Sequence, residues 1–213
     1  MGQKRFLGIT GTNNSGKETF VKCIKENKEL GLVRHFSVSE FAEKMANERN
    51  IFFETRDHFK DFMNNVRKVD GGDFFVKHIH QSVNHSEDNE LIIIESIRCL
   101  DEVVFLKEHN IPLIGINASS KKRHERSLVR NTKKDTQETL EEFLQQEESE
   151  CYEETYRQNL PVVLRKVNML ILNNYNSYDS FYDTIRKEHL PILLEYVSKG
   201  IFQIPIHNGG IIC

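Results

Sequence analysis

The stretch GITGTNNSGKET, residues 8–19, decides the fold of this chain. Within it, Gly11, Gly16 and Lys17 satisfy the spacing G-x-x-x-x-G-K. The apolar run of residues 4–10 predicts a strand, and the amphipathic pattern that starts at Lys17 predicts a helix. A glycine-containing loop between strand and helix turns backbone N–H groups toward a phosphate at the positive end of the helix. The sequence therefore predicts a phosphate-binding loop.

The residue after the loop lysine departs from the usual pattern. Lys17 supplies a mobile cation for the outer phosphates, but Glu18 stands where a Ser or Thr hydroxyl normally meets magnesium. Thr19 does not simply occupy the missing site, because a helix advances about 100° per residue. Glu18 can bind magnesium through water or point away from it. The residues expected to hold the donor nucleotide are Gly11, Asn13, Asn14, Ser15, Gly16, Lys17, Glu18 and Thr19.

Strands and helices alternate along the rest of the chain. Further strands are expected at residues 31–37, 90–96, 111–117 and 169–172. The unbroken apolar centre of ELIIIES is typical of a strand covered on both faces by helices. This alternation predicts an α/β fold with a mostly parallel sheet. We expect one domain over residues 1–200, followed by an apolar tail at 201–213 whose role the sequence does not indicate.

Several helix boundaries are also predicted. Ser39 is expected to cap the helix that contains EFAEKMANE. Residues 55–84 should form two helices separated at Gly71-Gly72. A last helix is expected from about 177 to 198, broken or kinked at Pro191.

The composition excludes several classes of protein. With 38% hydrophobic residues, a chain of 213 residues can bury a core, which excludes general disorder. The net charge of -3 gives no global positive field for nucleic acid. The four cysteines show no C-x-x-C spacing, so neither a zinc site nor a disulfide framework is indicated, and a cytoplasmic location is expected. The apolar runs are far shorter than the roughly 20 residues that span a bilayer, so we expect no membrane partner.

Four further stretches extend the pattern: HFSVSEF at 35–41, IIIESIR at 92–98, RHERSLVR at 123–130 and EEFLQQEESE at 141–150. Together with the loop, they make the chain resemble the P-loop small-molecule kinases, within them the nucleoside-monophosphate-kinase-like and dephospho-coenzyme-A-kinase-like group. The resemblance implies a three-layer fold, a five-stranded sheet in the order 2-3-1-4-5 and a helical lid at about 119–135. It also implies ATP and Mg²⁺ as cofactors and a small phosphorylated acceptor, with a nucleoside or deoxynucleoside monophosphate favoured.

Two charged residues follow the most apolar strand. Glu95 stands at its end, where a carboxylate needs a cation, a metal or a donor, and where ligands of parallel sheets bind. We expect Glu95 to contact a magnesium-bound water or a substrate hydroxyl; the alternative is a structural partner for Ser96. Arg98 can hold a substrate phosphate through its planar fork, with a surface salt bridge as the alternative.

The lid carries Arg123, Arg126 and Arg130 at helical spacing, so one helix face can present them together. Arg126 and Arg130 are the candidates for stabilising the charge that develops during phosphoryl transfer. The alternative is a solvated basic helix that pairs with the acidic segment 136–154, which holds eight glutamates.

The resemblance places Arg56 and Arg67 in the region that covers the acceptor in related kinases, and Ser39 is counted with them as a substrate contact. For Arg56 and Arg67, the alternative is an arginine on the protein surface. The loop reads phosphate and not acceptor, so a dephospho-coenzyme-A kinase stays open. A regulatory nucleotide-binding protein without catalysis also stays open, because of Glu18. The sequence does not indicate an oligomeric state.

Overall fold

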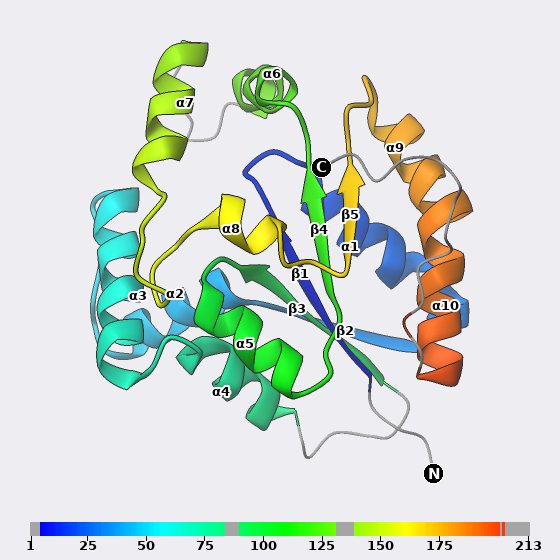
Figure 1. Ribbon diagram of the computed structural model, residues 1–213, viewed down its shortest axis with the longest axis horizontal. Helices are drawn as coiled ribbons and strands as arrows, with labels where there is room; N and C mark the ends of the chain where they lie inside the picture. Colours follow the sequence, from blue (N-terminus) through cyan, green and yellow to red (C-terminus); the bar gives the residue numbers. More distant parts are fainter. Residues whose placement is uncertain (1–4, 84–89, 131–138, 201, 203–213) are drawn as a thin grey trace.

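Five parallel strands form one sheet in the order β2-β3-β1-β4-β5 (Figure 1). The computed structural model describes residues 5–83, 90–130, 139–200 and 202; the side chains of Arg56 and Arg130 lie outside this description. The strands are β1 (Arg5–Gly11), β2 (Leu32–Ser37), β3 (Glu90–Ile97), β4 (Leu113–Asn117) and β5 (Met169–Leu172). The α/β class and the strand order expected from the resemblance are confirmed.

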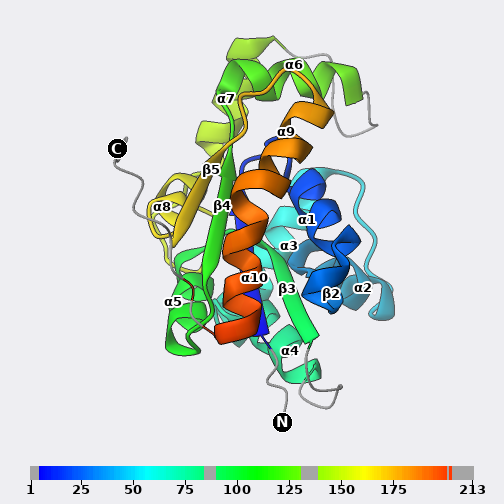
Figure 2. The same ribbon diagram turned by 90° about the vertical axis from the view of Figure 1, so that its right-hand side faces the viewer.

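Helices cover both faces of the sheet. The helices are α1 (Lys17–Glu26), α2 (Val38–Glu48), α3 (Arg56–Asp70), α4 (Phe74–Ser82), α5 (Leu100–Glu108), α6 (Ser120–Arg130), α7 (Leu140–Ser149), α8 (Leu160–Leu164), α9 (Tyr178–Thr184) and α10 (Leu190–Lys199), with a 3₁₀ turn at Lys28–Leu30. Helices α1, α9 and α10 pack on one face, and α2, α3, α4, α5 and α8 on the other (Figure 2). None of the helices in the described ranges is long and apolar enough to cross a membrane.

The apolar centre of β3 is buried on both faces. Leu91 and Ile93 belong to the core beside α1, whereas Ile92 and Ile94 belong to the core on the opposite face. All four side chains are fully buried. Alternate side chains of β3 thus belong to two different cores, so the stretch from Leu91 to Ile94 is apolar at every position.

A bulge re-aims the carboxyl end of β3. Ile9 pairs with Glu95, but Thr10 pairs with Ile97, so Ser96 is the extra residue and has a φ of 73°. The hydroxyl of Thr10 donates to the carbonyl of Ile97 at 2.6 Å. A bulge of this kind changes the direction in which the following side chains point. It lies between Glu95, near the end of β3, and Arg98, which follows the strand.

The start of α2 differs from the prediction. Ser37, not Ser39, is the N-cap, and its hydroxyl accepts from the backbone N–H of Glu40. Ser37 ends β2 with extended backbone angles, so its side chain faces the first turn without an intervening loop. Ser39 lies in that first turn. The predicted break at Gly71-Gly72 is confirmed, because α3 ends at Asp70 and α4 begins at Phe74.

The last helical region is continuous in path but not in geometry. Ser177 caps α9 through the N–H of Ser180, and a π-helical segment, Ile185–His189, joins α9 to α10. The irregularity predicted at Pro191 therefore lies in the turn before it. Of the predicted tail at 201–213, only Phe202 falls in the described residues, where its ring packs on Tyr196.

Candidate functional site

The loop between β1 and α1 has the backbone of a phosphate-binding loop. Gly16 is the N-cap of α1 with a φ of 101°, a conformation that favours glycine. A Cβ at Gly16 would collide with the side-chain amide of Asn173, and one at Gly11 would collide with the carbonyl of Ile116. Both glycines of the motif are thus required by close backbone approach. The loop is packed tightly against the ends of β4 and β5.

The polar groups of the loop fit an anion. Lys17 Nζ donates to the carbonyls of Gly11 at 3.0 Å and Thr12 at 2.9 Å, so its ammonium lies over the loop. Ser15 Oγ is buried and has no hydrogen-bond partner among the described residues. Within the part of the chain that the structure describes, no side chain caps the start of α1. A hydroxyl in need of a partner, a positive helix end and an ammonium together match the chemistry of a nucleotide phosphate.

Two asparagines at the ends of neighbouring strands hold the loop in shape. Asn173, just after β5, donates from Nδ2 to the carbonyl of Ser15 at 2.8 Å. Asn117, the last residue of β4, accepts from the hydroxyl of Thr12 at 2.8 Å. The sequence analysis missed both. The available signal was their position, since polar residues at the carboxyl ends of parallel strands lie where ligands bind.

Helix α6, the predicted lid, lies beyond the carboxyl ends of β4 and β5 (Figure 1), and its Arg126 side chain reaches the loop. Arg126 Nη1 donates to the carbonyl of Asn14 at 3.2 Å. Its Nη2 donates to the carbonyls of Asn173 at 2.9 Å and Tyr175 at 3.0 Å. The guanidinium therefore bridges the phosphate loop and the segment after β5. Of the two predicted catalytic arginines, Arg126 lies beside the loop; the side chain of Arg130, like lid residues 131–135, lies outside the described residues.

Arg123 has a different role from Arg126. It is 7% exposed, donates from Nε to the carbonyl of Ala118 at 2.9 Å, and forms an ion pair with Glu147 of α7. Its guanidinium also stacks over the ring of Phe143. For this residue, the pairing of a basic with an acidic helix is the observed arrangement. The expectation that one helix face presents Arg123 together with Arg126 to a ligand is wrong.

The two candidate metal ligands occupy different surroundings. Glu18 is exposed in the first turn of α1. It lines a pocket of about 410 Å³ together with other residues of α1 and His35 of β2. Glu95 is half-buried and accepts from the hydroxyl of Ser96 at 2.8 Å, the structural partner named as the alternative. Across the described ranges, no group of three or more His, Cys, Asp or Glu side chains could hold a metal. A magnesium role for Glu18 and Glu95 stays a prediction.

Arg98 reaches from the end of β3 to the phosphate loop. Its Nη2 donates to Asn13 Oδ1 at 3.1 Å, and its Nη1 donates to Gln158 Oε1 at 3.3 Å. Both acceptors are amide oxygens rather than surface carboxylates. The guanidinium therefore lies between the loop that would hold the donor and the segment before α8.

Arg67 does not face open space, which corrects the prediction that it contacts substrate. It is 3% exposed, and its Nη2 donates to Glu102 Oε1 at 2.7 Å. Burial lowers the pKa of the Arg67 guanidinium, but the Glu102 carboxylate outweighs this effect, so the pKa is raised. Glu102 Oε2 accepts from the backbone N–H of Arg98 at 2.7 Å and of Cys99 at 3.2 Å. Arg67 thus fixes the carboxylate that anchors the end of β3.

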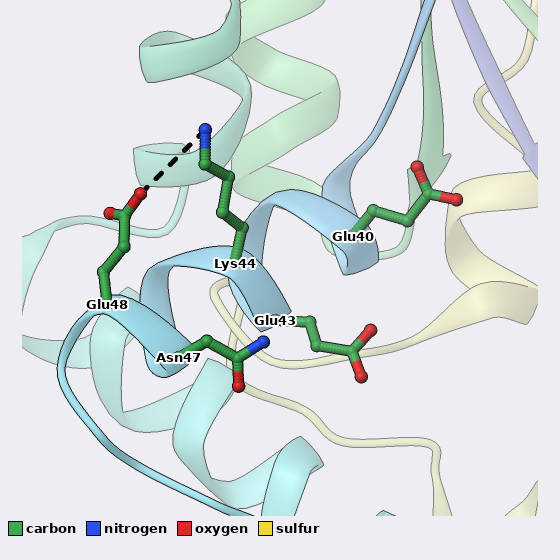
Figure 3. A pocket seen from close by; sticks show the side chains of 5 residues that line it. All are labelled: Glu40, Glu43, Lys44, Asn47 and Glu48. Atoms are coloured by element: carbon green, nitrogen blue, oxygen red, sulfur yellow. Dashed lines mark ion pairs between the residues drawn. The ribbon is translucent and has the colours of Figure 1, made fainter.

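The remaining candidates for contact with the acceptor are Ser39 and Arg56. Ser39 is half-buried in α2, and Arg56 is the first residue of α3. A pocket of about 500 Å³ runs along α2, lined by Glu40, Glu43, Lys44, Asn47 and Glu48 (Figure 3). Its one lysine is paired with Glu48 at 3.9 Å. Carboxylates outnumber cations there, so this pocket does not suit a phosphorylated acceptor.

Comparisons with known proteins place the fold. No protein-family model matches the chain. A UPF0200 protein of Methanococcus vannielii is 26% identical over 191 residues, covering 85% of this chain and 92% of the relative. TT1252 from Thermus thermophilus is 15% identical in sequence, with a TM-score of 0.55 over 89% of this chain and 97% of its own. The five-stranded parallel sheet in the order 2-3-1-4-5 is the fold that the resemblance to the P-loop kinases predicts.

A proposed kinase from Chloroflexus aurantiacus is also similar, with 15% identity and a TM-score of 0.50 over 87% of this chain and 98% of its own. The likeness to a P-loop small-molecule kinase, predicted from the loop and the four stretches around it, is therefore confirmed at the level of the fold.

Proposed function

We propose that this protein transfers the γ-phosphoryl group of ATP to a small phosphorylated acceptor, with a nucleoside or deoxynucleoside monophosphate favoured. One observation carries the proposal. Two cations from different elements meet at one phosphate-binding loop: Lys17 Nζ contacts the carbonyls of Gly11 and Thr12, and Arg126 of the lid contacts the carbonyl of Asn14. Phosphoryl transfer needs positive charge on several sides of the transferring group, and this arrangement supplies it.

Each part of the site has a role in this proposal. The loop amides and Lys17 hold the donor phosphates, and Arg126, with Arg130, stabilises the charge of the transition state. A magnesium ion would neutralise charge on the donor phosphates, held by Glu18 and Glu95 directly or through water. Arg98, which contacts Asn13 of the loop, would hold the phosphate of the acceptor.

A screen with a matched pair of lysine variants tests the proposal. Nucleoside and deoxynucleoside monophosphates and dephospho-coenzyme A are offered with ATP and Mg²⁺, and release of ADP is measured. Lys17→Ala should keep its fold and lose at least about tenfold in turnover, the effect of one lost charge-assisted contact. Lys199→Ala, on the exposed end of α10, is the control and should retain wild-type turnover. Equal turnover of both variants would refute the role of the loop.

Glu18 supports a second candidate function, a regulatory protein that binds the nucleotide without transferring phosphate. It replaces the hydroxyl that normally meets the metal, and it lies exposed at the start of α1. A binding measurement with ATP, made beside the turnover screen, separates the two functions. Tight ATP binding without transfer to any acceptor favours the regulatory protein.

A further inference from the structure

A chain of polar contacts joins the phosphate loop to helix α3. It runs from Asn13 to Arg98, from Arg98 to Gln158, from Gln158 to Glu150 and from Glu150 to Lys60. Lys60 Nζ lies 3.0 Å from Glu150 Oε1, and Gln158 Nε2 donates to Glu150 Oε2. The chain connects residues that are far apart in the sequence.

The chemistry of these groups fixes the orientation of Gln158. An ionised carboxylate only accepts hydrogen bonds, so the amide nitrogen of Gln158 must face Glu150. Its amide oxygen then faces the guanidinium of Arg98, which only donates. Gln158 is 8% exposed and Glu150 is 5% exposed, so water competes little for either contact. Gln158 thus donates to the carboxylate of Glu150 and accepts from the guanidinium of Arg98.

The backbone of Arg98 is held as firmly as its side chain. Its N–H donates to Glu102 at 2.7 Å, and its carbonyl accepts from the N–H of Asn159 at 2.9 Å. The side-chain torsions place the guanidinium, and its contacts include those with Gln158 and Asn13. Both offer neutral amide oxygens, which a phosphate dianion can replace as a stronger acceptor.

We propose that Gln158, held by Glu150 and Lys60, is a positioning residue that aims Arg98 at the phosphate of the acceptor. The proposal rests on the proposed function, because it assigns the acceptor phosphate to Arg98. It also makes the anionic group of the acceptor, rather than its base or sugar, the feature that this side of the site reads. Ordering the guanidinium before binding lowers the entropy lost when the acceptor binds.

The test compares two glutamine variants. Gln158→Met keeps the length of the side chain and removes both polar contacts; Gln145→Met makes the same change on the exposed face of α7. With the acceptor found by the turnover screen, Gln158→Met should raise KM for the acceptor about tenfold while KM for ATP stays within about twofold. Gln145→Met should leave both constants unchanged.

A second readout needs no acceptor. In ¹⁵N spectra of the free protein, restricted rotation of the Arg98 guanidinium should be seen in the wild type and in Gln145→Met, and should be lost in Gln158→Met. Arg98→Lys assigns the signal. This arm separates the two proposals, because a wild type that transfers phosphate to no acceptor refutes the proposed function while the spectra still decide the positioning.

Three results would overturn the inference. One is an Arg98 signal that stays restricted in folded Gln158→Met. Another is an equal rise of KM for ATP and acceptor. The third is an unchanged KM for the acceptor in a variant that has lost only thermal stability. If Gln158→Met does not fold, Glu150→Gln replaces it. That change removes the carboxylate that orients Gln158, so the same two readouts must move in the same direction.

Discussion

Removing the carboxylate of Glu102 should destabilise the protein more than most single substitutions. Glu102 is fully buried and accepts four hydrogen bonds: from Nε and Nη2 of Arg67, and from the backbone N–H groups of Arg98 and Cys99. Glu102→Leu fills the space but leaves a buried guanidinium and two backbone N–H groups without this acceptor.

The expected cost follows from that burial. Breaking a buried ion pair by removing one partner costs about 3–5 kcal/mol, because the other charge is left uncompensated. For a domain of this size, the loss corresponds to a fall in Tm of about 6–20 °C. The free energy of unfolding of a typical domain is about 5–15 kcal/mol, so the loss removes most of the stability only at the lower end of this range.

Chemical denaturation in urea measures the effect for Glu102→Leu, Arg67→Met and the double variant. The double variant removes the unpaired charge but not the two unpaired N–H groups, so it should recover only part of the loss. The cycle should return a coupling of about 2 kcal/mol between the two side chains. A cost below about 1 kcal/mol for Glu102→Leu would contradict the buried pair, as would additive single effects.

Three further predictions concern the nucleotide site and pH. Glu18→Ser should lower the magnesium concentration needed for half-maximal ATP binding, measured by titration; a higher requirement would show that Glu18 binds the metal. Arg126→Ala should reduce kcat by about 10- to 150-fold and ATP affinity far less, and Arg126→Lys should restore only part; normal turnover of the alanine variant would leave Arg126 a purely structural bridge. Burial lowers the pKa of His35, His80 and His189 below 6.5, so the unfolded chain binds these protons first as the pH falls. The free energy of unfolding should therefore decline below about pH 6.5, and less steeply in His35→Leu; an unchanged slope would count against this cause.

The parts of the site that the sequence reveals are those made by local pattern. Gly11, Gly16 and Lys17 belong to one short motif, and the strand before it and the helix after it have clear periodicity. The sheet order came from the resemblance, because alternating strands and helices fit several orders. Arg126 donates to the carbonyl of Asn14 in the loop, but its catalytic role stays a prediction.

Contacts between distant segments could not be predicted. The resemblance predicts Arg67 as a substrate contact, and nothing in its own helix indicates the buried carboxylate of Glu102, 35 residues later. Gln158 meets Arg98 across 60 residues and lies in a stretch without periodicity. A charged or amide side chain shows its partner only when the fold brings the two together, so such roles need the three-dimensional structure.

The π-helical segment before α10 makes the orientation of α10 depend on the number of residues in that segment. A π turn holds about one residue more than an α turn, and this segment ends directly before α10, whose second residue is Pro191. Deleting one residue from 185–189 would restore α spacing but rotate everything after it by about 100° about the helix axis. Leu193 and Tyr196, now buried against the sheet, would then turn outward. The register of the final helix is therefore set by a single surplus residue, and this segment should tolerate substitution better than deletion.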